Sequence, residues 1–375
     1  MKIHCDYPGG NIIVEKIDGG AVYLRQDRRD TEGWWFYWNF QIQGAAGRKL
    51  AFQFTDGNPI GVLGPAKSAD GGGSWRWLGA ECVSDSSFEY GFGRDERQVR
   101  FAFAIPYQLA DFERFAEAHM SAEHLRLFNL CRTRKHRPVP AVRLGCLAGE
   151  PLHRIVLTAR HHACESLASY VMEGFIDAVL ADNETGRWFR EHAEILAIPF
   201  VDLDGVEDGD QGKNRKPRDH NRDYLGESIY PEVRAIRDLL PKWSKGKLRV
   251  AFDLHCPWIR GEYNEVIYIV GSSDPAIWKE QCAFGEILAN VQEGPLVYRS
   301  EDNLPFGKAW NTGANYASGK SFSRWAGELD SVVLSAGLEI PYARANNGEV
   351  TAGTAKAFGR DLARAMHQYL LRRAP

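Results

Sequence analysis

The sequence predicts an α/β domain with a mixed, twisted sheet flanked by helices, preceded by an antiparallel β-sandwich domain. Up to about residue 120, short β-type segments alternate with Gly, Asp and Ser turns, as in antiparallel sandwiches. From Val142 onwards, apolar strand-like runs alternate with helical patterns, which implies an α/β sheet. We therefore assign residues 1–125 to the β-sandwich domain and residues 126–375 to the α/β domain, a division that 375 residues allow.

The predicted sandwich contains five β-type segments, at residues 21–25, 34–43, 50–55, 75–78 and 99–105. The second segment includes an aromatic cluster that begins at Trp34 and ends at Phe40. A surface platform for carbohydrate or peptide stacking is one interpretation, but we favour a buried strand because aromatic side chains dominate core burial. Apolar residues at helical spacing then predict a helix over 111–128, followed by a basic connector over 132–140 that we interpret as a solvated loop.

The predicted α/β domain alternates strands with helices. Strands are expected at residues 154–159, 195–201, 249–254, 266–270 and 331–338, and helices at 166–181, 231–240, 275–291 and 351–371. Pro199 lies inside one strand pattern, and because proline cannot donate a backbone hydrogen bond, the boundary of that strand stays open.

Composition excludes several classes of partner. Hydrophobic residues make up 44% and charged residues 25% of the chain, with a formal net charge of −3, so there is no electrostatic case for nucleic acid or an anionic membrane. The first residues lack the apolar core of a signal peptide, and no run approaches the length of a membrane span. The seven Cys are odd in number and scattered, which fits reduced thiols and predicts a cytoplasmic location.

A candidate metal site follows the buried-strand pattern at residues 155–159. His162 and Glu165 form His-x-x-Glu where that strand gives way to a helix, and both side chains are good zinc ligands. This motif alone is weak, but His255 ends a second buried-strand pattern, and ligands collect at the carboxyl ends of strands in α/β sheets. Two His and one Glu complete a catalytic Zn²⁺ site that leaves one position for water.

A second pair competes with this assignment. His161 and Cys164 form His-x-x-Cys, which could bind a soft metal, so the choice between His161 and His162 stays open at this point. Cys164 and Cys256 each adjoin a proposed ligand. We interpret both as small wall residues because no separate His–carboxylate base remains to activate a thiol.

These motifs resemble those of the zinc carboxypeptidases, most closely the cytosolic carboxypeptidase branch with its extra amino-terminal β-domain. The resemblance covers nearly the whole chain and is carried by the zinc-ligand set, by Asp219-x-Asn221-Arg222, and by Glu339 in a Leu-Glu-x-Pro context. It implies a zinc metallocarboxypeptidase that hydrolyses carboxyl-terminal residues from peptides or protein tails. Zn²⁺ is then the expected cofactor, a peptide tail is the expected partner, and the oligomeric state stays open.

The resemblance also implies roles for individual residues. Glu339 would be the general base that moves a proton from the attacking water to the leaving amine, and an acid that ends an apolar run is costly to bury unless it is employed. Asn221 and Arg222 would hold the substrate carboxylate, which a forked guanidinium binds with two hydrogen bonds. Asp219 would orient the first zinc-binding His.

Further roles follow from the neighbouring motifs. Arg215 is expected to stabilise the oxyanion, with Arg218 as the alternative. The resemblance implies that Tyr316 closes over the substrate and that Lys320, Ser323 and Arg324 lie on or near the side-chain pocket. An inward-facing Lys320 or Arg324 would favour an acidic terminal residue such as Glu, whereas the competing interpretation leaves both side chains in solvent.

Two other functions remain as alternatives. A zinc amidase or deacylase acting on small N-acyl amino acids would use a similar ligand set and the same carboxylate-binding Arg, but it would be expected to lack the amino-terminal β-domain. An inactive relative that binds carboxyl-terminal tails would be expected to have lost a ligand or the base, and in this sequence His162, Glu165, His255 and Glu339 are all present.

Overall fold

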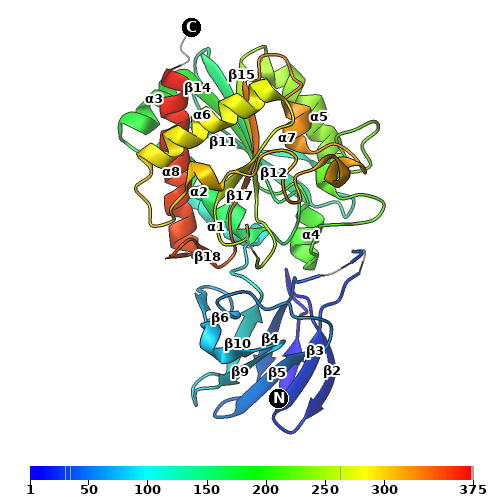
Figure 1. Cartoon of the computed structure of the whole chain (residues 1–375). Coiled ribbons are helices and arrows are strands. Elements are labelled where there is room, and N and C mark those ends of the chain that lie inside the picture. Colours follow the sequence, from blue (N-terminus) through cyan, green and yellow to red (C-terminus); the bar gives the residue numbers. More distant parts are fainter. Residues whose placement is uncertain (30, 34, 262, 373–375) are drawn as a thin grey trace.

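The computed structural model describes residues 1–29, 31–33, 35–261 and 263–372, and it contains a β-sandwich followed by a larger α/β part (Figure 1). The sandwich consists of two five-stranded sheets. In sheet order, the first contains β1 (Lys2–His4), β4 (Asn39–Gln43), β10 (Gln98–Ala102), β6 (Ala66–Ser68) and β7 (Arg76–Trp77). The second contains β2 (Ile13–Asp18), β3 (Ala21–Arg25), β5 (Lys49–Phe54), β9 (Ser87–Gly91) and β8 (Val83–Ser84).

Aromatic rings fill the space between these two sheets. Phe52 stacks on Phe88 with ring centroids 4.7 Å apart, and Trp38 packs against Phe40 at 5.9 Å. Residues 35–38 are buried, so the interpretation of the aromatic cluster as core is confirmed there, whereas Trp34 lies outside the described residues. One pair departs from the antiparallel pattern, because β3 and β5 run parallel.

The α/β part contains a seven-stranded mixed sheet, as predicted. Its strands, in order across the sheet, are β11 (Leu125–Arg132), β12 (Pro138–Gly145), β14 (Ala193–Ile198), β13 (His153–Ala159), β15 (Leu248–His255), β17 (Leu334–Glu339) and β16 (Tyr268–Val270). The four central strands are parallel, and the strands at both edges are antiparallel to their neighbours. The carboxyl ends of β13, β15 and β17 therefore meet at one edge of the sheet.

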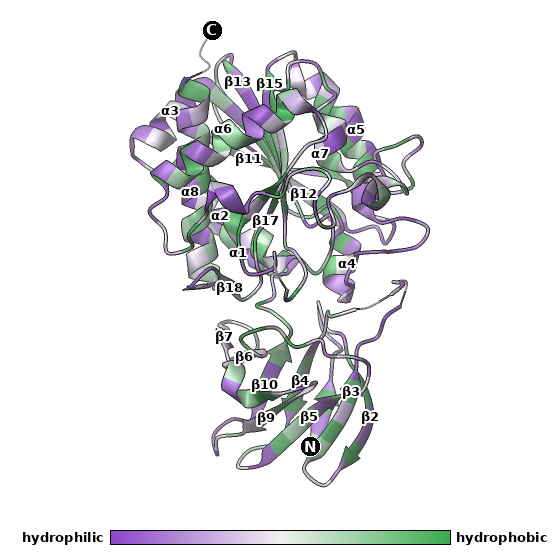
Figure 2. Cartoon of the chain, viewed as in Figure 1, coloured by the Kyte–Doolittle hydropathy of each residue, from purple (hydrophilic) through white to green (hydrophobic). Residues whose placement is uncertain are grey.

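Helices cover both faces of this sheet (Figure 1). The helices are α1 (Leu109–Ala118), α2 (Ser166–Leu180), α3 (Glu184–His192), α4 (Leu203–Asp208), α5 (Pro231–Ser244), α6 (Pro275–Val291), α7 (Phe322–Ala326) and α8 (Ala352–Leu371). Along β13, Ile155 and Leu157 face the core that contains α2 and α8, while Val156 faces the core that contains α5. Hydrophobic residues accordingly concentrate on the sheet and on the inner sides of its helices (Figure 2).

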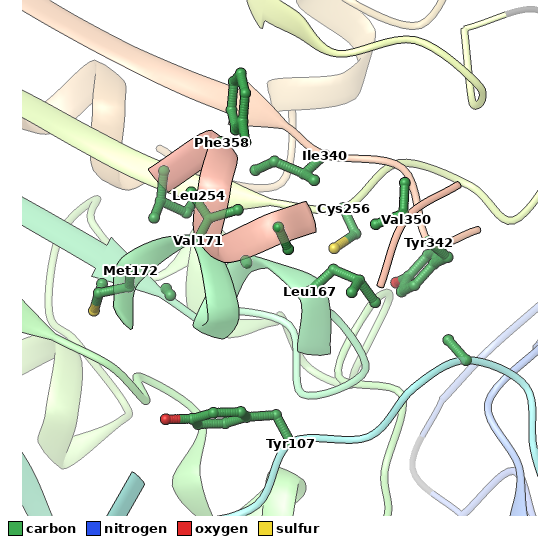
Figure 3. Close-up of a cluster of buried hydrophobic side chains, with 14 of the residues drawn as sticks. Tyr107, Leu167, Val171, Met172, Leu254, Cys256, Ile340, Tyr342, Val350 and Phe358 are labelled. Carbon is green, nitrogen blue, oxygen red and sulfur yellow. The ribbon is translucent and has the colours of Figure 1, made fainter. Parts of the chain in front are cut away.

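The core that contains α2 and α8 packs against one face of the sheet. Figure 3 shows Leu167 and Val171 of α2 beside Phe358 of α8 and Leu254 of β15.

None of the helices in the described part of the chain combines the length and apolar character that a membrane span requires.

The structure corrects two predictions between residues 111 and 140. The predicted helix ends at Ala118 instead of 128, and its last residues belong to β11. The predicted connector is the turn of a hairpin, because β11 pairs antiparallel with β12 through Leu125 and Leu144. Residues 125–128 continue the helical spacing of apolar residues, but antiparallel pairing with β12 decides their conformation.

The predicted domain boundary at residue 125 falls at the first residue of β11. Helix α1, which precedes it, packs on the α/β part, where the Phe112 and Phe200 rings lie 6.0 Å apart. Asn11 of the sandwich also donates a buried 2.8 Å hydrogen bond to the Gly209 carbonyl. The two parts of the chain therefore share an ordered interface.

The buried carboxylate of Glu194 links its own strand, β14, to β12, β13 and α5. Its carboxylate accepts hydrogen bonds from Arg143 (2.6 Å), Arg154 (2.8 Å) and Trp243 (2.9 Å). Burial raises the pKa of Glu194, but these hydrogen bonds outweigh it and the net pKa is lowered. We expect Glu194→Gln to lower the free energy of unfolding by about 3–5 kcal/mol at pH 7 in urea titrations, because Arg154 stays buried without its countercharge.

The pH dependence of the free energy of unfolding tests whether the ionised Glu194 carboxylate causes this difference. The pKa of Glu194 is lower in the folded chain than the unfolded value of about 4.3, so the wild-type advantage is complete above that value and is lost as pH falls. The difference between wild type and variant should therefore shrink in acid. Glu150→Gln, which removes an exposed partner of Lys247, should change the unfolding midpoint little, and a pH-independent difference at Glu194 would contradict the assignment.

Candidate active site

The predicted metal ligands meet at the carboxyl ends of β13 and β15. His162 lies in the loop after β13, Glu165 is the residue before α2, and His255 is the last residue of β15. Glu165 Oε1 lies 2.9 Å from His162 Nδ1, and Glu165 Oε2 lies 2.7 Å from His255 Nδ1. The three donor atoms lie within 4.8 Å of one another, and two imidazoles with one carboxylate match the donor set of a zinc site.

A second group of possible ligands shares His255 with this one. It consists of His161, Asp253 and His255. Both ring nitrogens of His161 are already engaged, with Nδ1 2.7 Å from Asp253 Oδ1 and Nε2 2.7 Å from the Tyr224 hydroxyl. His161 and Asp253 therefore support His255 from behind, and the structure favours His162 over His161 as the ligand.

Cys164 also faces away from the metal ligands. Its Sγ lies 3.3 Å from the Tyr342 hydroxyl, and burial raises the pKa of the thiol to about 12. Cys164 belongs to the hydrophobic core, and neither candidate group of metal ligands includes it. The interpretation of Cys164 as a wall residue agrees with this placement, and Cys256 is likewise fully buried in the core shown in Figure 3.

Asp253 is a supporting residue that the sequence analysis did not identify. Its Oδ2 lies 2.6 Å from His255 Nε2, and Thr158 donates a 2.8 Å hydrogen bond to its Oδ1. When the carboxylate accepts a hydrogen bond from Nε2–H of His255, the Nδ1 atom beside Glu165 keeps the lone pair that a metal ligand needs. The sequence could have indicated this role, because Asp253 and His255 are two residues apart on a predicted strand and their side chains point to the same face.

Replacement of Asp253 should weaken metal binding without removing a ligand. We expect Asp253→Asn to lower zinc affinity about 10- to 100-fold, because the tautomer and orientation of His255 are no longer fixed. Competition with a chromophoric chelator measures this affinity directly. Unchanged zinc affinity in a folded Asp253→Asn protein would show that the His255 ring is oriented by other contacts.

Asp219 lies behind the other imidazole. Its Oδ1 is 3.7 Å from His162 Nε2, which is an ion-pair distance rather than a hydrogen bond, and Asp219 is buried. Burial raises the pKa of Asp219, but His162 and the nearby Arg222 outweigh this effect and the net pKa is lowered. The structure therefore places an ionised carboxylate on the side of His162 that faces away from Glu165.

Glu339 reaches the site because β15 and β17 are neighbours. His255 and Glu339 are paired in register at the last positions of these parallel strands. Glu339 is buried, its Oε2 has no hydrogen-bond partner among the described residues, and burial raises its pKa. It lines a cavity of about 490 Å³, here called the metal-site cavity, together with His162, Glu165, His255, Asp219, Asn221, Arg222 and Tyr316.

The Asp219-x-Asn221-Arg222 motif forms one wall of that cavity. Arg222 donates to the Asn315 carbonyl (3.1 Å) and to its side-chain oxygen (3.2 Å). Asn221 accepts a 2.9 Å hydrogen bond from the Phe322 amide, and its amide nitrogen lies 3.0 Å from His255 Nε2. Both side chains are thus held in place by neutral groups at the edge of the cavity.

Tyr316 lines both the metal-site cavity and a second cavity of about 320 Å³, here called the side-chain cavity, which Arg324 also lines. The Tyr316 ring lies between two guanidiniums, with Arg324 Cζ 3.5 Å and Arg222 Cζ 5.2 Å from its centroid. Ser323 lines both cavities. Lys320 lines the side-chain cavity as well, but its ammonium is paired with Glu328 at 2.7 Å.

The two proposed oxyanion arginines lie elsewhere. Arg215 pairs with Asp202 (2.8 Å) and Asp210 (2.9 Å), and Arg218 pairs with Asp223 (2.6 Å). Neither arginine is among the described residues that line the metal-site cavity, whereas Lys213 is. The structure thus brings the ligand set, Glu339, Asn221, Arg222 and Tyr316 together and leaves Arg215 and Arg218 outside.

Comparison with curated proteins identifies relatives of one kind. The chain is 27% identical to cytosolic carboxypeptidase 2 of Xenopus tropicalis over 158 residues, which covers 40% of this chain and 16% of that protein. It is 25% identical to cytosolic carboxypeptidase 4 of Homo sapiens over 224 residues, which covers 55% and 20% respectively. The chain therefore spans a fifth or less of the length of these relatives. No family model matches the chain.

Solved structures share the whole fold. A metallo-carboxypeptidase from Burkholderia cenocepacia superposes with a TM-score of 0.83 at 20% identity, covering 100% of this chain and 99% of the other. A metallo-carboxypeptidase from Pseudomonas aeruginosa, solved in complex with (2-guanidinoethylmercapto)succinic acid, gives 0.82 at 18% identity and covers 100% of both chains. The predicted fold is confirmed, sandwich included, and so is the predicted resemblance to the cytosolic carboxypeptidases.

Proposed function

We propose that the chain belongs to the zinc carboxypeptidase family, on its cytosolic branch, and that it is a zinc metallocarboxypeptidase acting on peptides or protein tails. One observation carries the proposal. A single cavity contains a zinc-type ligand set, a buried carboxylate with an unpartnered oxygen, and a guanidinium suited to a terminal carboxylate. Each of these groups corresponds to one requirement of carboxypeptidase chemistry.

His162, Glu165 and His255 would hold the ion, and their donor chemistry fits Zn²⁺. A bound zinc ion polarises the scissile carbonyl and lowers the pKa of the attacking water to about 7. Asp219 and Asp253 would keep the two imidazoles in the orientation that directs Nδ1 at Glu165.

Glu339 would accept the proton of the attacking water at Oε2 and then deliver it to the leaving amine. Its raised pKa suits this double role, because a general base works best when its pKa approaches the operating pH. Glu339 is buried and lines the same cavity as the three proposed ligands, so its carboxylate is near the place where the ion would be held.

Arg222 and Asn221 would bind the carboxylate of the terminal residue. A carboxylate makes charge-assisted hydrogen bonds to a guanidinium, which are about twice as strong as bonds to neutral acceptors. It can therefore replace the Asn315 oxygens as the partner of Arg222. Tyr316 would cover the bound residue from its place between Arg222 and Arg324.

We further propose a preference for an acidic terminal side chain such as Glu. Arg324 lines the side-chain cavity, and its Nη2 has no hydrogen-bond partner within the described residues. The two carboxylates along that cavity are engaged, Glu328 with Lys320 and Asp274 as the cap of α6. Arg324 therefore remains the group that an acidic side chain would bind, whereas Lys320 is the weaker candidate.

The names of the relatives support a cytoplasmic location and a peptide or protein substrate for this chain as well. Its proposed partner is accordingly a carboxyl-terminal tail. The solved carboxypeptidases superpose on the whole chain, including the sandwich. This likeness favours the proposed function over the amidase or deacylase alternative, which would be expected to lack that domain.

Zinc-loaded protein, incubated with peptides that differ only in the last residue and analysed by mass spectrometry, tests the proposal. Loss of a single terminal residue is expected, fastest for Glu, and a chelator should abolish it until zinc is restored. The same assay should include N-acyl amino acids. Turnover of these alone would establish the deacylase alternative, and tail binding without any turnover would establish an inactive relative.

A further inference from the structure

Lys213 is a buried cation that the proposed chemistry has not yet used. Its Nζ lies 2.8 Å from Glu165 Oε1 and donates a 2.8 Å hydrogen bond to the Cys256 carbonyl. The side chain is only 16% exposed and lines the metal-site cavity beside Glu339. A lysine side chain carries an ammonium group, so this position offers three hydrogen-bond donors and a positive charge.

The position of this lysine is fixed by its loop. Gly212 has a φ of +81°, and a Cβ at this position would lie 2.4 Å from the Ala163 amide nitrogen. Only glycine allows such an approach, so the loop contacts the turn between His162 and Glu165 directly. Cys164 N donates to the Gln211 carbonyl at 3.0 Å, which joins the same two segments.

The sandwich holds this loop from the other side. The Gln211 side-chain oxygen accepts hydrogen bonds from the Phe36 amide (2.7 Å) and the Tyr37 amide (3.2 Å). Gln211 is fully buried. Lys213 therefore projects into the cavity from a backbone that is fixed by both parts of the chain.

We infer that Lys213 supplies the cation that stabilises negative charge on the scissile carbonyl oxygen, the role that the family resemblance gives to an arginine. This inference rests on the proposed function. Arg215 lies between Asp202 and Asp210, and Arg218 pairs with Asp223, so both are directed at carboxylates outside the metal-site cavity. Lys213 is the described lysine that lines the cavity with Glu165 and Glu339.

The surroundings explain how the ammonium would become available. Glu165 would share its charge with a bound ion, and its attraction for Lys213 would then weaken. The ammonium then keeps the neutral Cys256 carbonyl as a partner, on a flexible four-carbon stem that can reach a substrate oxygen in the same cavity. Preorganised charge of this kind acts mainly on the transition state, where the oxygen becomes an anion.

Lys213→Met tests the inference, because it keeps the length of the stem and removes the charge. We expect kcat on the best peptide to fall about 10²- to 10³-fold with little change in KM, as for the loss of one oxyanion-hole donor. The affinity for a phosphinic peptide, whose tetrahedral anion resembles the transition state, should fall by a similar factor in calorimetry. The affinity for the product peptide and the zinc content should not change, and Lys213→Arg should restore part of kcat.

Lys216→Met is the matched control from the same loop. Lys216 is 61% exposed and pairs with Glu32, so its replacement should leave kcat and analogue binding unchanged. The inference is overturned if Lys213→Met leaves both unchanged, or if it alters only zinc affinity while activity per bound zinc stays constant. Failure of the wild-type protein to hydrolyse any peptide would instead overturn the proposed function, and this inference with it.

Discussion

Glu339→Gln should lower kcat by about 10²- to 10⁴-fold while zinc remains bound. The amide has the shape of the carboxylate but cannot accept a proton, and general acid–base catalysis contributes rate factors of this size. Glu339 is the best-placed base because it is paired in register with His255, is buried, and has an unpartnered oxygen among the described residues. Kinetics with a Glu-terminated peptide, alongside metal analysis of the same preparation, measures the effect.

The pH profile separates loss of a base from general damage. Glu339 must be ionised to accept a proton, so the wild-type rate should rise with pH through its pKa, which burial raises above the usual range for Glu. The residual rate of the Gln variant should lack this component. Glu150→Gln, an exposed acid that pairs with Lys247 and lines neither cavity, is the matched control for rate. Full activity of Glu339→Gln with zinc bound would exclude Glu339 as the base.

Arg324→Gln should remove the preference for an acidic terminal residue. Arg324 is only partly buried, and a hydrogen bond to a charged group contributes about 1.5–3 kcal/mol, which corresponds to a fall in kcat/KM of roughly 10- to 150-fold for a Glu-terminated peptide. Peptides that end in Ala or Leu should lose much less, because they do not use the guanidinium. The ratio of kcat/KM values for Glu and Leu termini is therefore the quantity to measure.

Lys320→Met distinguishes the two basic residues of the side-chain cavity. Lys320 is held by Glu328 on the exposed side, so its removal should change the ratio by less than about fivefold. A larger effect of Lys320→Met than of Arg324→Gln would show that Lys320, and not Arg324, recognises the substrate side chain. Equal rates for Glu and Leu termini in the wild-type protein would remove the acidic preference altogether.

Much of the candidate site could be predicted from the sequence because its geometry is local or follows from the sheet. His162 and Glu165 are three residues apart at a strand-to-helix turn, so their proximity needs no tertiary contact. His255 and Glu339 each end a buried apolar run, and parallel neighbouring strands bring such ends together.

Other features depend on contacts that no local pattern encodes. Lys213 lies in a basic loop of a kind that is typical of solvated surface. The backbone of this loop is fixed by the close approach of Gly212 to Ala163 and by the hydrogen bonds of Gln211. The two acids that engage Arg215 in the structure, Asp202 and Asp210, lie outside its motif, so the motif alone does not show these ion pairs. The end of α1 was misplaced because residues 125–128 satisfy a helical pattern, while pairing with β12 decides their conformation.

The hydrogen bonds of Gln211 have a consequence for chimeric enzymes. Phe36 and Glu32 contact the loop through Gln211 and Asn214, while Thr31 pairs with Arg215 across the same boundary. A sandwich transplanted from a homologue would have to bring these contacts with it. The two parts are thus coupled through this loop, although each has a sheet system of its own.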